Sequence, residues 1–225
     1  MSSITITIDG PAGAGKGTLA RHLAQIYHLD HLDTGLLYRA VALKMLEENE
    51  DLTDEKAAIK IASSLRMDTL KNPALRDEAV GDAASQIATF PEVRKVLLTF
   101  QRDFANTPSK EKKGVVLDGR DIGLVILPEA FCKIYVTASP EVRARRRLKE
   151  LHQKEINSIY EVVLEDIKVR DARDQTREVS PLQPARGAFI LDTSELNIGE
   201  VVEKACFFVD SKYPKAYKRT SSSFE

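Results

Sequence analysis

Short apolar runs alternate with longer segments of helical periodicity along this chain. Isoleucine alternates with threonine over residues 4–8, which is typical of a β-strand. Further apolar runs predict strands over 115–119, 131–137 and 188–191. Strands of this kind, separated by helices, indicate a parallel sheet covered by helices on both faces. The predicted fold class is therefore α/β.

The segments between these runs show the spacing of amphipathic helices. It predicts helices over 19–27, 36–46, 53–65, 75–88, 91–100, 140–147, 159–174 and 197–209, and leaves 67–73 as a loop. Ligands bind at the carboxyl ends of the strands in such a sheet. We therefore expect one edge of the sheet to carry the residues that follow or end the strands, Asp9, Asp33, Asp118 and Thr137.

The composition narrows the picture by exclusion. The 225 residues are 43% hydrophobic and 30% charged, and 33 basic side chains oppose 34 acidic ones for a net charge of -1. This balance disfavours a globally basic nucleic-acid binder. The chain lacks a membrane-spanning apolar run and a basic leader followed by an apolar stretch. We expect a cytoplasmic protein with neither a membrane nor a nucleic-acid partner.

The length and the small number of cysteines limit the architecture. At roughly 150 residues per domain, the length suits one domain with an appendage. We expect one domain over residues 1–210 and a mobile basic tail over 211–225. Cys132 and Cys206 offer no disulfide framework or zinc-ligand spacing and are expected to be packed thiols. The histidines also lack ligand spacing, so we expect ordinary surface or helix residues at His22, His28, His31 and His152.

A glycine-rich segment with one lysine joins the first strand to the first helix. Gly10, four residues, Gly15 and Lys16 form the pattern of a phosphate-binding loop. Its backbone N–H groups and the positive end of the following helix suit phosphates, and the lysine reaches the outer phosphates. The predicted ATP-binding residues are Gly10, Pro11, Ala12, Gly13, Ala14, Gly15, Lys16, Gly17 and Thr18.

One position departs from the usual loop pattern. Gly17 stands where a serine or threonine usually follows the lysine, and Thr18 comes next. Direct ligation of a metal by this hydroxyl is therefore less secure, and Asp118 at a strand end suits magnesium through bound waters or caps a turn. No asparagine precedes a lysine, as a guanine-reading motif would require. A small-molecule kinase is the simplest interpretation.

Arginines form a second set of candidate anion-binding residues, because the guanidinium fork binds phosphate and stays charged. They stand near predicted strand ends or along helices, at Arg39, Arg94, Arg120, Arg143, Arg145, Arg146, Arg147, Arg170, Arg173 and Arg177. Residues 143–147 could instead be a solvated helix face. Arg170 and Asp174 could form an ion pair within one helix.

Five motifs in order resemble the bacterial-type cytidylate kinases, which are P-loop nucleoside monophosphate kinases. They lie at residues 8–18, 32–39, 84–94, 118–123 and 170–182, and the resemblance runs from Ile4 to about Val209. It implies an enzyme that transfers a phosphoryl group from ATP with Mg²⁺ to CMP or dCMP. It also implies a P-loop kinase fold, an acceptor-binding insertion over about 50–105 and an arginine-rich lid over about 143–160. We expect a monomer.

The resemblance assigns roles residue by residue. It implies catalytic roles for Lys16, Arg39, Arg120 and Arg177, and contacts with the acceptor phosphate or sugar for Thr34 and those three arginines. Ser85, Arg94 and Asp121 match positions that read the pyrimidine, and Arg170 and Asp174 match positions that hold the ribose. Arg146 matches the lid over ATP, and Thr18 and Asp118 are candidate metal positions, directly or through water.

Two departures and two rival functions remain. Many members of the family carry a longer insertion with a small sheet where this chain has only residues 67–75, so closure over the nucleotide is in doubt. The tail lies outside the resemblance.

One rival function is a kinase of adenylate, uridylate or shikimate, which the 84–86 motif and Arg94 disfavour. The other is a nucleotide-binding regulatory module whose basic tail touches nucleic acid.

Overall fold

A five-stranded parallel sheet organises the molecule, in a computed structural model that describes residues 3–214. Its strands are β1 (Ile4–Asp9), β2 (Asp30–Asp33), β3 (Gly114–Gly119), β4 (Cys132–Thr137) and β5 (Phe189–Asp192). The order is β2-β3-β1-β4-β5, and every neighbouring pair is parallel. The sheet confirms the predicted α/β class and places β1, which leads into the phosphate loop, at its centre.

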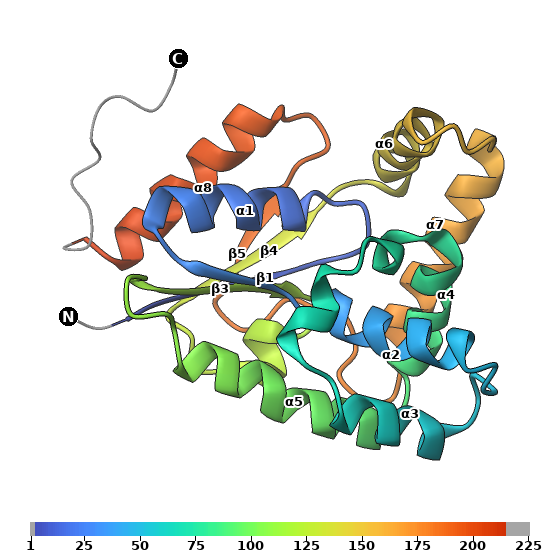
Figure 1. The fold of residues 1–225 in the computed structure, drawn as a ribbon. Coiled ribbons are helices and arrows are strands. Elements are labelled where there is room, and N and C mark those ends of the chain that lie inside the picture. The colour runs from blue at the N-terminus through green and yellow to red at the C-terminus, as the bar shows by residue number, and fades with distance from the viewer. Residues whose placement is uncertain (1–2, 215–225) are drawn as a thin grey trace.

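Two helices, α1 (Lys16–Tyr27) and α8 (Ile198–Lys212), cover one face of the sheet (Figure 1). Leu19 and Leu23 of α1 are fully buried against strand residues and α8. Cys132 and Cys206 are buried thiols in this core, as predicted. Burial raises the pKa of the Cys132 thiol to about 12.

The opposite face carries the larger group of helices. They are α2 (Gly35–Glu47), α3 (Glu55–Ser63), α4 (Glu78–Ile87) and α5 (Pro91–Asn106), and Figure 1 shows α5 across the sheet from α1. Leu37, Met45, Ile87 and Leu97 are fully buried in the shared core. This packing fixes α2 and α4 beside the carboxyl end of β3.

A helical hairpin stands at one end of the molecule. Helix α6 (Pro140–Gln153) begins at Ser139, whose hydroxyl accepts a hydrogen bond from the Val142 N–H at 3.3 Å, as the sequence predicts. Helix α7 (Tyr160–Thr176) packs against α6 around Ala144, Leu151 and Val163. Within residues 3–214 no helix is long and apolar enough to cross a membrane.

The predicted loop over 67–73 is wrong in detail. Residues Met67–Lys71 and Pro73–Arg76 form 3₁₀ turns, so α4 begins at Glu78 and not at 75. The Asn72 side chain accepts a hydrogen bond from the Ala74 N–H at 3.0 Å and starts the second turn. A cap between residues two positions apart gives no apolar periodicity, so the hydrophobic pattern did not predict this turn.

Two other segments also differ from expectation. Residues Ile122–Ile126 form a π-helical turn that was not predicted, and the Asp9 carboxylate caps it by accepting hydrogen bonds from the Ile122 and Gly123 N–H groups. Helix α8 runs to Lys212, past the predicted start of the tail at 211. The Tyr213 hydroxyl donates to the Thr5 carbonyl at 3.1 Å. Residues 215–225 of the predicted tail lie outside the described part of the chain.

Candidate active site

The phosphate loop folds between β1 and α1 because glycines occupy the positions that other residues cannot. Gly10 has φ +146°, and a Cβ there would lie 1.9 Å from the Val136 carbonyl oxygen. Gly15 has φ +94° immediately before α1. Lys16 folds back over the loop, and its Nζ donates to the Pro11 carbonyl at 2.7 Å. The predicted strand, loop and helix are thus contiguous around an anion-binding turn.

The lysine of this loop is buried beside both arginine and carboxylate groups. Burial lowers the pKa of Lys16 to about 7, and the charge of Arg120 lowers it further, against the carboxylates of Asp118 and Asp33. Excess positive charge at a buried site is costly unless an anion arrives to compensate it. The electrostatics therefore favour a polyanionic ligand beside Lys16.

A narrow cavity of about 70 Å³ lies beside this loop and gathers the predicted acceptor residues. Its walls come from α2, α4, α5, α7 and the end of β3. All nine predicted substrate-binding residues line it, namely Thr34, Arg39, Ser85, Arg94, Arg120, Asp121, Arg170, Asp174 and Arg177.

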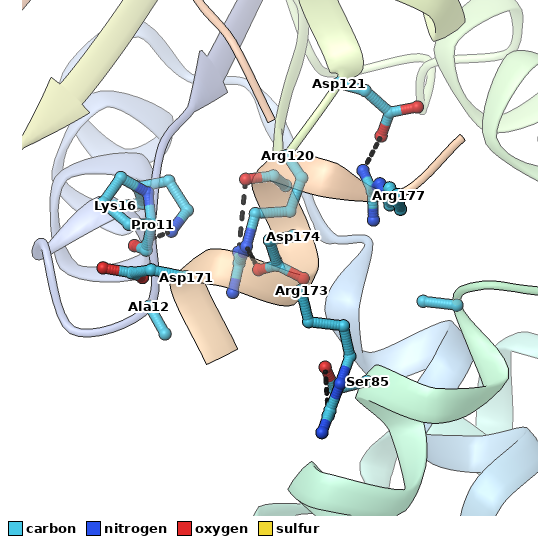
Figure 2. A network of polar contacts seen from close by, with 12 residues as sticks. Pro11, Ala12, Lys16, Ser85, Arg120, Asp121, Asp171, Arg173, Asp174 and Arg177 are labelled. Carbon is cyan, nitrogen blue, oxygen red and sulfur yellow. Dashed lines mark hydrogen bonds and ion pairs between the residues drawn. The ribbon is translucent and has the colours of Figure 1, made fainter. Parts of the chain in front are cut away.

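One end of the cavity is built around a buried ion pair. Arg94 Nη2 lies 2.6 Å from Asp121 Oδ2, and both side chains are buried. Arg94 also donates to the Ala88 carbonyl at 3.1 Å and lies over the ring of Tyr38. Ser85 lies nearby on α4, and its hydroxyl accepts a hydrogen bond from Arg173 at 3.1 Å (Figure 2). Donors and acceptors stand together here, as recognition of a planar polar ring requires.

Further guanidinium groups line the cavity, and that of Arg177 lies next to the Arg94–Asp121 pair. Arg120 Nε lies 2.9 Å from Asp174 Oδ2 (Figure 2). Among residues 3–214, Arg177 Nη2 and Arg170 Nε are buried without a hydrogen-bond partner, and Arg177 Nη2 lies 3.9 Å from Asp121 Oδ1. Burial, with the charge of Arg120, lowers the pKa of Arg170 to about 10. Buried donors without acceptors suit a phosphate.

Thr34 and Arg39 occupy the side of the cavity formed by α2. The Thr34 hydroxyl donates to the Asp118 carbonyl at 2.9 Å. Arg39 Nη1 donates to the Leu75 and Asp77 carbonyls at 2.8 and 3.2 Å, which hold the guanidinium against the start of α4. Burial lowers the pKa of Arg39. These contacts hold a further cation at the cavity wall.

Acidic side chains meet at the ends of β2 and β3. Asp33 and Asp118 are partners in the sheet register, and burial with the Asp118 charge raises the pKa of Asp33. His31 Nε2 lies 2.6 Å from Asp118 Oδ1, so the expectation of an ordinary surface or helix histidine is wrong at this position. A Cβ at position 17 would lie 3.7 Å from Asp118 Oδ2, which places this carboxylate beside the phosphate loop.

The arginine-rich stretch of α6 is not a solvated face throughout. Arg146 donates to the Thr193 carbonyl at 2.6 Å and to its hydroxyl at 3.0 Å, and that hydroxyl donates to Ala14 of the phosphate loop at 3.2 Å. Arg147 forms an ion pair with Glu78 of α4. Arg143 is buried and forms an ion pair with Asp171. Helix α6 thus contacts both the loop side and the acceptor side.

Sequence reasoning gave no role at the site to His31 and Asp171, and it gave Arg143 and Arg173 only as candidate anion-binding residues. His31 and Arg173 contact the predicted residues Asp118 and Ser85. Arg143 and Asp171 pair between α6 and α7. Arg173 and Asp171 do stand inside the 170–182 motif, which is the signal that could have marked them.

The sheet order and the phosphate loop define a P-loop kinase fold. The chain resembles in structure an uncharacterized protein from Eubacterium ventriosum, with a TM-score of 0.54 at 16% identity over 93% of this chain and 99% of that one. It also resembles the shikimate kinase of Bacteroides thetaiotaomicron, with a TM-score of 0.50 at 12% identity over 95% of this chain and 99% of that one. At these identities the likeness concerns the fold alone.

Similarity in sequence identifies the family more specifically than similarity in fold does. The family model described as cytidylate kinase matches residues 6–211. Proteins named cytidylate kinase are 51% identical in Paramagnetospirillum magneticum, over 94% of this chain and 100% of that protein, and 49% identical in Bartonella tribocorum, over 93% and 96%. The chain belongs to the cytidylate kinase family, as the resemblance predicted.

Proposed function

We propose that this protein transfers the γ-phosphoryl group of ATP to CMP and dCMP, giving ADP with CDP or dCDP. The observation that carries the proposal is that all nine expected acceptor residues line one cavity beside the phosphate loop. Two polyanions must approach each other in this reaction, and catalysis is largely positioning and charge stabilisation. Membership of the cytidylate kinase family supports the same activity.

The roles of the residues follow from their chemistry. The nine residues from Gly10 to Thr18, Lys16 among them, would hold the ATP phosphates, and Arg146 would close over them. Arg39, Arg120 and Arg177 would hold the acceptor phosphate and follow the charge of the moving phosphoryl group. No general base is required, because the acceptor oxygen already belongs to an anion.

The base and sugar would occupy the remaining walls. Arg94 can donate to the carbonyl oxygen and ring nitrogen of cytosine, while Ser85 and Asp121 can accept from its amine. Arg170 and Asp174 would hold the ribose, and Thr34 would lie against the acceptor phosphate or sugar. The Arg94–Asp121 pair at 2.6 Å supports this placement, because it fixes a donor and an acceptor side by side.

The residues at the ends of β2 and β3 fit a magnesium ion that arrives with ATP. Asp118 and Asp33 are adjacent carboxylates whose mutual repulsion a hard cation would relieve, and Asp118 Oδ2 faces the phosphate loop. Asp118 would hold the ion through water, and Thr18 would contribute its hydroxyl. The Thr18 hydroxyl accepts a hydrogen bond from Arg21 at 3.3 Å, and its second lone pair could bind the ion. The ion would neutralise phosphate charge during transfer.

A coupled assay of ADP release tests the function. ATP and Mg²⁺ are supplied with CMP, dCMP, UMP, AMP, shikimate or no acceptor, and nucleotide products are quantified. We expect CMP and dCMP to support rapid turnover and the other acceptors to support little. Equal turnover with AMP or shikimate would assign another kinase activity, and ATP binding without any acceptor-dependent turnover would favour the regulatory module.

Four further expectations belong to the same proposal. We expect a monomer in the cytoplasm, with residues 50–105 and 143–160 moving over the acceptor and ATP. The 33 basic and 34 acidic residues support the absence of a nucleic-acid partner. Light scattering with and without nucleotides would test the monomer, and a stable dimer would overturn it.

A further inference from the structure

A buried ion pair that has no part in the scheme above joins the phosphate loop to helix α7. Arg143 Nη1 and Nη2 donate to the two carboxylate oxygens of Asp171 at 2.9 and 2.6 Å. The Arg143 side chain is 3% exposed and that of Asp171 is 13% exposed. Neither residue lines the acceptor cavity, among the residues described. A pair this buried costs desolvation, so its retention calls for a positional reason.

The same guanidinium also contacts the phosphate loop. Arg143 Nη1 donates to the Ala12 carbonyl at 3.3 Å, and Nε donates to the Ala138 carbonyl at 2.9 Å. A Cβ at Gly13 would lie 3.3 Å from Arg143 Cβ, so the arginine stem passes close to the loop backbone. Arg143 therefore joins the ATP loop, the end of β4 and helix α7 through one planar group.

Helix α7 contacts three separate elements from successive positions. Asp171 pairs with Arg143, Arg173 donates to Ser85 of α4, and Asp174 pairs with Arg120 at the end of β3. Figure 2 shows Asp171 on the side of Ala12 and Lys16, while Asp174 turns to Arg120. Without the Arg143–Asp171 pair, α7 would keep its contacts with the acceptor side but lose this link to the phosphate loop.

We propose that Arg143 and Asp171 are positioning residues that set the distance and angle between the ATP loop and the acceptor-holding helix α7. The inference rests on the proposed function. The atoms that react must approach to about 3–3.5 Å in line, and a displacement of about 1 Å can cost about 100-fold in rate. Each nucleotide would retain its own binding residues, so the loss would fall on transfer and not on binding.

Conservative variants test the proposal on the full-length enzyme. Asp171→Asn keeps the shape and removes the charge, and Arg143→Lys keeps the charge and removes the planar fork. We expect either variant to lower kcat by about 10- to 100-fold while the KM for ATP and for CMP changes by less than about threefold. The double variant should be no slower than the slower single variant, because the two residues act as one unit.

The matched control is Asp166→Asn, which removes one carboxylate from an exposed position of the same helix. Its kcat should equal that of the wild type. A second readout is the number of CDP molecules formed per ADP released, which does not depend on the folded fraction. We expect this yield to fall below one in Asp171→Asn, since a misaligned γ-phosphoryl group is passed to water, giving inorganic phosphate.

The outcomes separate this inference from the proposed function. A wild type without CMP-dependent turnover overturns the proposed function. An active wild type with normal kcat and yield in Asp171→Asn and Arg143→Lys overturns the inference alone, as does a rise in KM without a fall in kcat. If the single variants fail to fold, Arg143→Met/Asp171→Leu replaces both charges together, which often preserves stability. Normal kcat and CDP yield in that double variant would also overturn the inference.

Discussion

At the scale of single residues, the acceptor cavity divides its arginines into two kinds. Arg94 and Arg120 are within 2.6 and 2.9 Å of carboxylates and are largely satisfied by the protein. Arg177 and Arg170 each have a buried nitrogen with no hydrogen-bond partner in the described part of the chain. Since a buried donor without an acceptor is costly, the second kind has the most to gain from a bound anion.

Arg177→Ala should therefore weaken CMP recognition. Loss of a charged hydrogen bond is worth about 1.5–3 kcal/mol, or about 10- to 150-fold in the dissociation constant for CMP. Titration calorimetry with CMP measures it. Cytidine, which has no phosphate, should bind wild type and variant equally poorly. CMP affinity equal to that of the wild type would assign Arg177 to a structural ion pair.

Asp121→Ala should narrow the preference for CMP over UMP. The carboxylate can only accept, so it suits the amine of cytosine and opposes the carbonyl of uracil. Its loss should lower kcat/KM for CMP by about tenfold more than for UMP. The ratio of the two kcat/KM values is independent of the folded fraction, which matters because Arg94 loses its partner. An unchanged ratio here and in Ser85→Ala and Arg94→Ala would remove the base from this end of the cavity.

Lys16→Ala should abolish most turnover and alter the pH dependence of stability. Removal of a charge that acts on the transferring group costs about 100-fold or more in turnover.

The same residue should make stability depend on pH. Burial lowers the pKa of Lys16 from 10.5 to about 7, so the unfolded chain binds more protons than the folded chain between these pH values. The contribution of this group to stability therefore rises with pH. Denaturant titrations at pH 6, 8 and 10 should show this rise in the wild type relative to Lys16→Ala. Normal turnover in the variant would contradict the ATP site.

At the scale of elements, the start of a helix can be predicted from the sequence where a side chain caps it. Helix α8 begins at Asn197, whose side chain accepts from the Glu200 N–H at 3.1 Å while Glu200 accepts from the Asn197 N–H at 2.8 Å. This capping box stands in the sequence as a spacing of three residues. Helix α7 has no side-chain cap at Ile159, and its position depends on the distant partners of Asp171 and Asp174.

Asn197→Ala should lower stability without changing catalysis. Loss of an N-cap costs about 1 kcal/mol, which corresponds to about 2–4 °C in Tm for a protein of this size. Thermal unfolding measures the shift, and kcat with CMP should stay within about twofold of the wild type. Asn197→Asp keeps an acceptor and should restore the Tm. A Tm unchanged by the alanine would mean that α8 is held by packing alone.

At the scale of the whole molecule, local patterns predicted which segments meet but not how their side chains pair. The strand runs and the phosphate loop are contiguous in sequence, and the shared edge of a parallel sheet then brings the motifs together. The pairs His31–Asp118 and Arg173–Ser85 join residues 87 and 88 positions apart, and no periodicity encodes such contacts. The 3₁₀ and π turns escaped for a different reason, because they depend on the side chains of Asn72 and Asp9.

Because both cysteines are buried, a thiol reagent should not label the folded native chain. Cys132 on β4 and Cys206 on α8 are both buried in the core, and the Cys132 thiol, whose pKa burial raises to about 12, holds almost no reactive thiolate at neutral pH. A maleimide should therefore leave the folded wild type unmodified by mass spectrometry and modify both cysteines after denaturation. Cysteines introduced at the exposed positions Lys149 and Glu48 could then carry a fluorophore pair that follows the lid as nucleotides bind. Rapid labelling of the native wild type would show that this core opens.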